Sequence, residues 1–127
     1  MEETAKISKK FLSAQKSMIS DKSLLINLTG EMPLFKIIDF LLDNKGTDFS
    51  KLDISKGAGV SRASLFNYWN EIEKHGIVKT TRSFGKTKLY ALNTKNPVTQ
   101  KIIELEKTLI SEAMNKAYKE KEILVRH

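Results

Sequence analysis

Two short helix-forming segments meet at one glycine near the middle of the chain, and this junction restricts the fold more than any other feature. Ser50 precedes the first segment, residues 51–58, and its hydroxyl can cap the free amides at a helix N-terminus. Gly59 follows, and glycine readily takes the left-handed conformation that ends a helix. Ser61 then offers an N-cap for a second helix, from Arg62 to about residue 75. The pattern predicts two helices joined by a tight turn.

The side chains around this turn suit a close crossing of the two helices. Ser55, four residues before the glycine, is small enough for the helices to approach each other. Apolar residues occupy the positions that would pack at the crossing, namely Ile54, Ala58, Val60, Leu65 and Tyr68. Because so many positions agree, the segment predicts a helix-turn-helix far more specifically than a lone glycine would.

The elements on either side extend this unit into a small domain. Pro33 opens a strongly apolar segment that ends near Asn44 and predicts a buried helix before the turn. After Gly76, two β-prone runs, residues 77–82 and 86–92, flank Ser83-Phe84-Gly85 and predict a hairpin with glycine at its tip. The predicted fold class is mainly α with a small β-hairpin wing (α+β): a winged helix-turn-helix over residues 31–94.

Helical extensions are expected at both ends of this domain. An amphipathic helix is expected over residues 4–20, within an N-terminal extension of residues 1–30. The apolar patch of residues 23–28 could form a strand or a helix. Asn96 and Pro97 open a long helix within residues 95–127, and its apolar stripe favours a homodimer through this helix, with the N-terminal helix as a second contact. The stripe includes Ile102, Leu105, Leu109 and Ala113.

Charge and cysteine content narrow the function. The 127 residues include 22 Lys and Arg against 15 Asp and Glu, a formal net charge of +7, which favours polyanionic partners such as nucleic acid. With no cysteine, disulfides and thiolate metal sites are excluded. No apolar run is long enough to cross a bilayer and the N-terminus lacks the apolar stretch of a signal peptide, so we expect a cytoplasmic protein. A nucleic-acid partner would make it nucleoid-associated.

Three segments carry a resemblance to a known family. Residues 53–65 (DISKGAGVSRASL), 73–79 (EKHGIVK) and 85–93 (GKTKLYALN) resemble archaeal winged-helix transcriptional regulators related to the MarR and ArsR groups. The resemblance covers roughly residues 32–110 and implies a dimeric repressor or activator that binds double-stranded DNA. Ser55 stands where such proteins usually carry alanine, a mild departure from the pattern.

In a helix-turn-helix, the start of the second helix enters the major groove, where each base pair presents a distinct pattern of donors and acceptors. Arg62 can pair with guanine and Asn67 with adenine, so these two are the main candidates for base readout. The alternative is an ordinary solvated helix face. Further candidates for DNA contact on this helix are Ser61, Ser64 and Phe66, although capping alone explains Ser61.

The hairpin is basic and free of acidic residues. Arg82 and Lys86 flank its tip, and with Lys88 they are the wing candidates for contact with the DNA backbone or minor groove. A solvated hairpin edge that carries lysines against aggregation would look similar. Lys51 and Lys56, on the preceding helix, could add phosphate contacts.

The remaining aromatic and histidine side chains favour structural roles. Trp69 shares one helix face with Leu65 and Ile72, which favours core packing over base stacking. Phe84 at the wing tip would be exposed unless it contacts DNA or a neighbouring subunit, and the sequence favours neither. His75 has only His127 as a second imidazole, so the sequence offers no metal or catalytic cluster, and neither an enzyme nor a cofactor is expected.

Three functions are consistent with these features. The first is a sequence-specific, homodimeric transcriptional regulator whose recognition helices reach major grooves roughly 34 Å apart. The second is a DNA-organising protein of plasmid partition, viral or chromatin type, with weak sequence preference. The third is a winged-helix module for protein interaction, which the acid-free wing disfavours.

Overall fold

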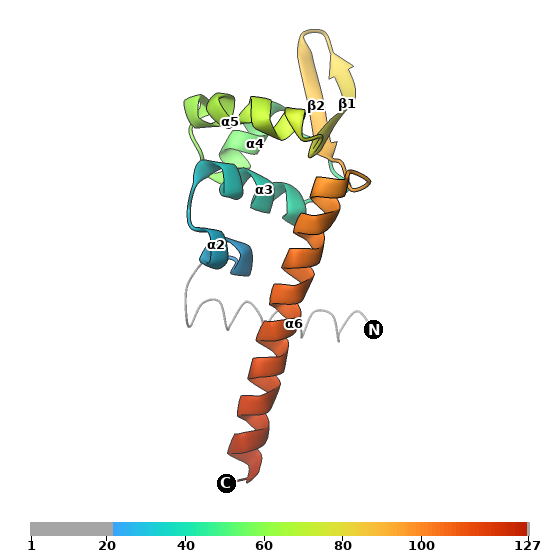
Figure 1. The fold of residues 1–127 in the computed structure, drawn as a ribbon. Helices are drawn as coiled ribbons and strands as arrows, with labels where there is room; N and C mark the ends of the chain where they lie inside the picture. The colour runs from blue at the N-terminus through green and yellow to red at the C-terminus, as the bar shows by residue number, and fades with distance from the viewer. Residues whose placement is uncertain (1–21, 127) are drawn as a thin grey trace.

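The computed structural model describes residues 22–126 and the side chains of residues 22–121. Along the chain the elements are α2 (Leu24–Thr29), α3 (Pro33–Asp43), α4 (Lys51–Ala58), α5 (Arg62–Lys74), β1 (Val78–Phe84), β2 (Thr87–Leu92) and α6 (Pro97–Arg126) (Figure 1). This order and the paired hairpin make the fold a winged helix-turn-helix of the α+β class, as the sequence predicted. The helix expected over residues 4–20 lies outside the described residues.

The apolar patch before the domain forms a short helix, α2. The Ser23 hydroxyl caps it by accepting a hydrogen bond from the amide of Ile26 at 3.1 Å. The cap satisfies one of the free amides and favours a helix over a strand in so short a segment. Leu25 and Ile26 are buried, and α2 packs on α3 and α6.

The predicted helix-turn-helix signals are confirmed. Ser50 accepts a hydrogen bond from the Asp53 amide at 3.2 Å, and Ser61 accepts one from the Ser64 amide at 3.1 Å, so a serine caps each helix. Gly59 ends α4 with a φ of 70°, in the left-handed region that the sequence required of it. The turn therefore fixes where α5 begins and how it leaves α4.

The wing is a two-stranded antiparallel hairpin in which Phe84 pairs with Thr87. Its turn is Gly85-Lys86, two residues later than the start of the predicted tip. Gly85 has a φ of 59° at the first central position, as a two-residue type II′ turn requires, so pairing continues up to Phe84. At its base, the hairpin is tied to the loop before α4 by two 2.8 Å backbone hydrogen bonds between Phe49 and Tyr90.

One apolar core lies beneath these elements, between α3, α5 and the base of the hairpin. Its fully buried side chains include Ile37, Leu41, Ile54, Leu65 and Ile72. Since they come from α3, α4 and α5, the core holds the helix-turn-helix as one rigid unit. Among residues 22–126, no helix combines the length and apolarity needed to cross a membrane.

The C-terminal helix begins as predicted and then leaves the domain. The Asn96 side chain caps α6 by accepting the Thr99 amide at 3.1 Å, with Pro97 in the first turn. The helix has 30 residues and extends well beyond the domain (Figure 1). Ile102 and Leu109 pack against the domain core, while Leu105 is 38% exposed. The predicted stripe is thus divided between the domain and the surface.

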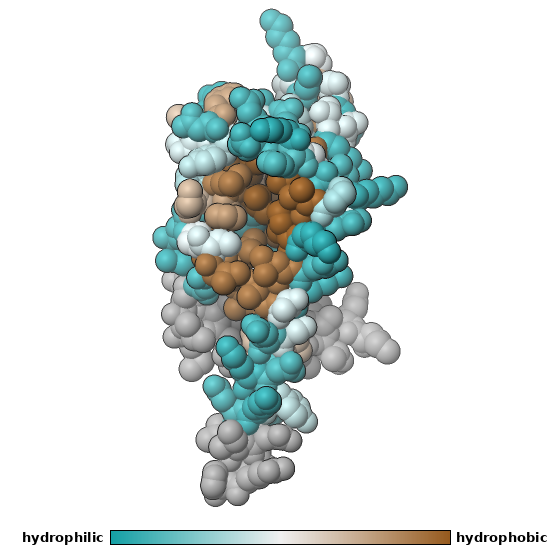
Figure 2. Space-filling model, viewed as in Figure 1, coloured by the Kyte–Doolittle hydropathy of each residue, from teal (hydrophilic) through white to brown (hydrophobic). Residues whose placement is uncertain are grey.

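An apolar area remains on one face of the domain. Figure 2 shows hydrophobic side chains gathered over α2, α3 and the first half of α6. Exposed large apolar residues on or next to these elements include Leu28, Met32, Val98 and Leu105. An apolar area of this kind is typical of a surface that contacts another protein.

Candidate nucleic-acid interface

The α5 helix separates its apolar residues from its polar ones. Leu65, Trp69 and Ile72 are buried against the core, while Arg62 and Asn67 are exposed. The first two turns of α5, residues 62–70, contain no acidic residue. The start of the helix therefore presents hydrogen-bonding side chains and one cation to the solvent, which is the chemistry that base edges in a major groove require.

The two serines at the start of α5 are bound to each other. In addition to the cap, the Ser61 hydroxyl donates a hydrogen bond to the Ser64 hydroxyl at 3.0 Å. Both side chains stabilise the helix start. Their hydroxyl oxygens lie at the N-terminal end of α5. The hydrogen bonds within the cap already use both hydroxyl groups.

Trp69 is a core residue, as predicted. It is 2% exposed, and its ring meets the ring of Tyr90 edge-on with centroids 4.9 Å apart. Burial, together with the charge of Glu73, raises the pKa of the Tyr90 phenol. This aromatic pair joins α5 to β2, so α5 and the base of the wing are held in one orientation.

Lys51 is placed differently from a simple surface lysine. Its ammonium lies 5.4 Å from the ring centroid of Phe66, 5.5 Å from that of Trp69 and 5.8 Å from that of Tyr90. Cation–π attraction to three rings holds the ammonium at the junction of α4, α5 and β2. Phe66, which is 55% exposed, covers this junction from the solvent side. Lys56, by contrast, lies exposed on α4.

The outer part of the wing is exposed on both faces. Every residue from 79 to 88 is exposed, including Lys79, Lys86 and Lys88. Between residues 77 and 92 the hairpin has no acidic side chain. It projects beyond α5 as a positively charged arm (Figure 1).

Arg82, the predicted wing arginine, is paired with a residue outside the wing. Its Nε and Nη2 donate hydrogen bonds to the Asp48 carboxylate at 2.9 and 2.8 Å, and the Thr81 hydroxyl donates to the same carboxylate at 2.6 Å. These donors lower the pKa of Asp48 to about 2, and the carboxylate raises the pKa of Arg82. We call this group the Asp48 latch: Asp48, Thr81 and Arg82.

A strand irregularity makes the latch possible. The register of the hairpin shifts between Thr80 and Arg82, so the two neighbouring residues Thr81 and Arg82 both reach the loop before α4. In a regular strand, neighbouring side chains point to opposite faces. Asp48 could not be predicted from the sequence, because it lies 34 positions before Arg82 and no local pattern joins the two residues.

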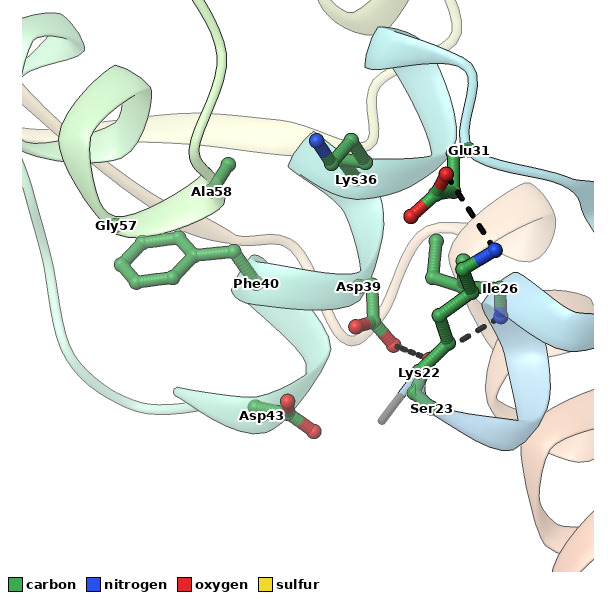
Figure 3. Close-up of a pocket in the computed structure, with 10 residues that line it drawn as sticks. All are labelled: Lys22, Ser23, Ile26, Glu31, Lys36, Asp39, Phe40, Asp43, Gly57 and Ala58. Atoms are coloured by element: carbon green, nitrogen blue, oxygen red, sulfur yellow. Dashed lines mark hydrogen bonds and ion pairs between the residues drawn. The ribbon is translucent and has the colours of Figure 1, made fainter. Parts of the chain in front are cut away.

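The described residues also form a pocket on another side of the domain. Side chains from α2, α3 and the end of α4 line a pocket of about 230 Å³ (Figure 3). Asp39 lies in it and accepts a hydrogen bond from Ser23 at 2.9 Å, and Lys22 pairs with Glu31 at 3.4 Å. No residue of α5 or the hairpin lines it, so it is separate from the candidate interface.

Three carboxylates gather beside this pocket. Oxygens of Asp39, Asp43 and Glu106 lie within 4.8 Å of one another, a cluster that spans α3 and α6 and was invisible in the sequence. Glu106 is 4.0 Å from the Lys45 ammonium, and Asp39 has the bond from Ser23. Because acidic side chains often lie this close together without a bound ion, the cluster is not evidence for a metal site.

Among comparisons with known proteins, only the search of solved structures finds similar chains. No protein-family model and no curated protein matches the chain. A mutant of Lactococcus lactis ZitR in its apo form is similar with a TM-score of 0.51 and 16% identity, over 97% of this chain and 90% of ZitR. NadR in complex with 4-hydroxyphenylacetate is similar with a TM-score of 0.50 and 19% identity, over 97% of this chain and 84% of NadR. A MarR family transcriptional regulator from Silicibacter pomeroyi has a TM-score of 0.45 at 14% identity, over 97% of this chain and 79% of that one.

Proposed function

We propose that the protein is a non-enzymatic transcriptional regulator that binds double-stranded DNA through α5 and the wing. The observation that carries this proposal is the continuity of charge and polarity over the two elements. The exposed start of α5 and the exposed hairpin, residues 62–70 and 77–92, contain no acidic residue, although acids are frequent elsewhere in the chain. A cytoplasmic location, in association with the nucleoid, follows from this function.

Base readout is assigned to the start of α5. Arg62 pairs with guanine and Asn67 with adenine in the major groove, and Ser64 and Phe66 border the same face. The exposure of Arg62, Phe66 and Asn67 supports these roles. Ser61 adds a phosphate contact at the helix start, alongside its capping bond.

Phosphate contacts are assigned to the lysines around the helix and on the wing. Lys51 is held at the junction of α4, α5 and β2, and Lys56 lies on the exposed side of α4. On the wing, Lys86 and Lys88 lie near the turn, and Arg82 keeps Nη1 outside its bonds to Asp48. These contacts position the protein on the duplex and carry no sequence information of their own.

Two chains associate through α6 in this proposal, with Ile102, Leu105, Leu109 and Ala113 at or near the contact. The support is the exposed edge of the helix: Val98 and Leu105 lie two turns apart on one side and are 41% and 38% exposed. Figure 2 shows an apolar area over α2, α3 and the first half of α6, which would extend such a contact. A homodimer would place two recognition helices roughly 34 Å apart on a near-palindromic site, as in the archaeal regulators that the sequence resembles.

The dimer is tested by two charge substitutions on opposite edges of α6. Leu105→Glu is expected to convert the protein to a monomer, because it buries a charge in the contact. Met114→Glu is the control, since Met114 is similarly exposed, at 42%, and lies about half a turn round the helix from Leu105. Sedimentation measures the molecular mass of each variant. An unchanged dimer for Leu105→Glu, or a monomeric parent protein, would refute the proposed interface.

DNA binding is tested through its dependence on salt. The affinity for a mixed-sequence duplex, followed by fluorescence anisotropy over a range of salt concentrations, should fall linearly on a double logarithmic plot. Replacing Lys86 and Lys88 by alanine should reduce the slope by about 0.9 for each phosphate that is no longer neutralised. The matched control replaces Lys116 and Lys119, on the exposed outer part of α6, by alanine. It removes the same number of charges and should leave the slope unchanged. An equal effect of both changes would show that only net charge matters.

A further inference from the structure

The wing has a feature that phosphate binding does not explain, an exposed phenylalanine at its tip. We infer that Phe84 is a wedge that inserts between base pairs from the minor groove, so that the wing unstacks and bends the DNA it binds. This inference rests on the proposed DNA-binding function and adds an activity to it, a change in the shape of the duplex.

The position of Phe84 suits a wedge. It is the last residue of β1, directly before the turn of Gly85 and Lys86, and at 61% it is the most exposed of the described phenylalanines. The hairpin residues around it, from 79 to 88, are all exposed as well. The strands of the arm are too wide for a minor groove about 6 Å across, but a single side chain at the tip can enter it.

The ring is also braced from behind. The Arg82 guanidinium lies 5.6 Å from the centre of the Phe84 ring, and the same guanidinium is bound to Asp48 by two hydrogen bonds. Asp48 belongs to the loop before α4, outside the hairpin. A continuous chain of contacts therefore runs from the body of the domain through Asp48 and Arg82 to Phe84. Such bracing reduces the entropy that the side chain loses on insertion.

The charge around the tip identifies DNA as the partner. Lys86 follows Phe84 in the turn, Lys88 pairs with Ser83 on the other face of the hairpin, and the hairpin has no acidic residue, so the tip is attracted to the phosphates of DNA. Proteins that separate base steps from the minor groove combine cationic side chains with an inserted apolar one, and the tip carries both. A protein partner for Phe84 would be favoured by an apolar surrounding, and the described residues 79–88 offer only Phe84 as a large exposed apolar side chain.

Insertion has a cost that depends on the sequence of the DNA. Separating two stacked base pairs costs a few kcal/mol in general, and pyrimidine–purine steps such as TA yield most easily. The wedge therefore adds a preference for a flexible step under the wing, beyond the bases that α5 contacts.

The test uses the full chain and a duplex of about thirty base pairs with a central TA step, in which 2-aminopurine replaces the adenine of that step. The fluorescence of 2-aminopurine rises when the base loses its stacking, and a dye pair on the duplex ends reports bending. Binding is measured separately by anisotropy. The variants are Phe84→Ala, Phe84→Leu and Lys86→Ala, all at exposed positions.

The parent protein should raise the 2-aminopurine signal and shorten the distance between the dyes. Phe84→Ala should abolish both changes while binding about tenfold more weakly, within the range measured for loss of one aromatic stack. Phe84→Leu should keep much of the unstacking, because leucine can also act as a wedge. Lys86→Ala should weaken binding and reduce the salt slope, yet leave the unstacking of the bound complex intact.

Other outcomes overturn the inference in distinguishable ways. Binding by the parent protein without unstacking or bending would refute the wedge and leave the proposed function standing, as would equal unstacking by Phe84→Ala. Absence of binding to any duplex would refute the proposed function itself, and the wedge with it. In that case Phe84 would be assigned to a contact with another protein.

Discussion

The helix-turn-helix and the outer wing are stabilised in opposite ways. Around the turn, each helix has its own serine cap, and α5 is held by Leu65, Trp69 and Ile72 in the core. In the outer wing, residues 79–88, every side chain is exposed, and the Asp48 latch connects this part to the domain. The α5 helix is therefore fixed by several buried contacts. The wing is tied to the domain at its base, through Tyr90, and its outer part is held by the Asp48 latch.

This difference indicates separate roles for the two regions. A rigid α5 suits base readout, because hydrogen bonds to base edges tolerate little displacement. The outer part of the wing, which has no buried side chain, can shift to follow the path of the DNA backbone. Substitutions should therefore affect global stability in the first region and local motion in the second.

The largest effect is expected for Leu65→Ala. Leu65 is 1% exposed, so truncation leaves a cavity in the core and should lower the free energy of unfolding by about 2–5 kcal/mol. Denaturant titration measures the loss. Asn67→Ala, two residues along the same helix but exposed, should change stability by less than about 0.5 kcal/mol. If the two variants lose the same stability, α5 is not anchored by its buried face.

A smaller loss is expected for Gly57→Ala at the end of α4. A Cβ atom there would overlap the Phe40 ring, which is itself packed on Phe49 with ring centroids 5.0 Å apart. Displacing that ring should cost about 1–3 kcal/mol of unfolding free energy. Adding Phe40→Leu should make the glycine substitution milder, since the ring is gone. A Gly57→Ala variant as stable as the parent protein would contradict this packing.

The wing should respond to Asp48→Asn with motion rather than unfolding. Asparagine cannot hold Arg82 by charge, so the amides of residues 79–88 should exchange with solvent faster in hydrogen–deuterium exchange, with little change in melting temperature. Glu112→Gln removes the same charge from the exposed surface of α6 and should leave the exchange of the wing unchanged. Unaltered wing exchange in Asp48→Asn would mean that the latch does not position the wing.

The smallest effect is the pH dependence of the same latch. The pKa of Asp48 is lowered from its usual 3.8 to about 2 by the bonds from Arg82 and Thr81. Since the folded pKa lies below the unfolded one, the latch stabilises the fold fully above about pH 4, and this contribution is lost as pH falls through 2. The NMR signal of Arg82 Nε–H should titrate with a midpoint near 2. A midpoint near 3.8 would indicate that the carboxylate is not bound.

The sequence predicted the helix-turn-helix well because its signals are local. Ser50, Gly59 and Ser61 each act on neighbouring amides, and the apolar positions of α5 repeat at helical spacing, so the caps and the buried face were visible without the fold. The residues 23–28 could not be assigned, because a patch so short has no resolvable period. The hairpin was predicted, but its turn was misplaced by the assumption that the glycine ended a three-residue tip.

The contacts that organise the candidate interface were beyond the sequence because they join distant segments. Arg82 was identified as a wing cation, yet its partner Asp48 lies in another loop. Lys51 was proposed as a phosphate contact, but the three rings around its ammonium come from two other elements. The DNA contacts of these residues, the homodimer and the archaeal resemblance remain predictions.

The central claim, that α5 reads DNA sequence, is tested most directly by selecting bound duplexes from a random library at near-physiological salt, with the parent protein and the Arg62→Ala, Asn67→Ala double variant in parallel. The account predicts a short inverted repeat that the parent protein enriches and the double variant does not, although that variant should still bind DNA weakly through its lysines. Enrichment of the same motif by both proteins would contradict base readout by Arg62 and Asn67. Salt-sensitive binding without any motif would assign the protein to DNA organisation instead of sequence-specific regulation.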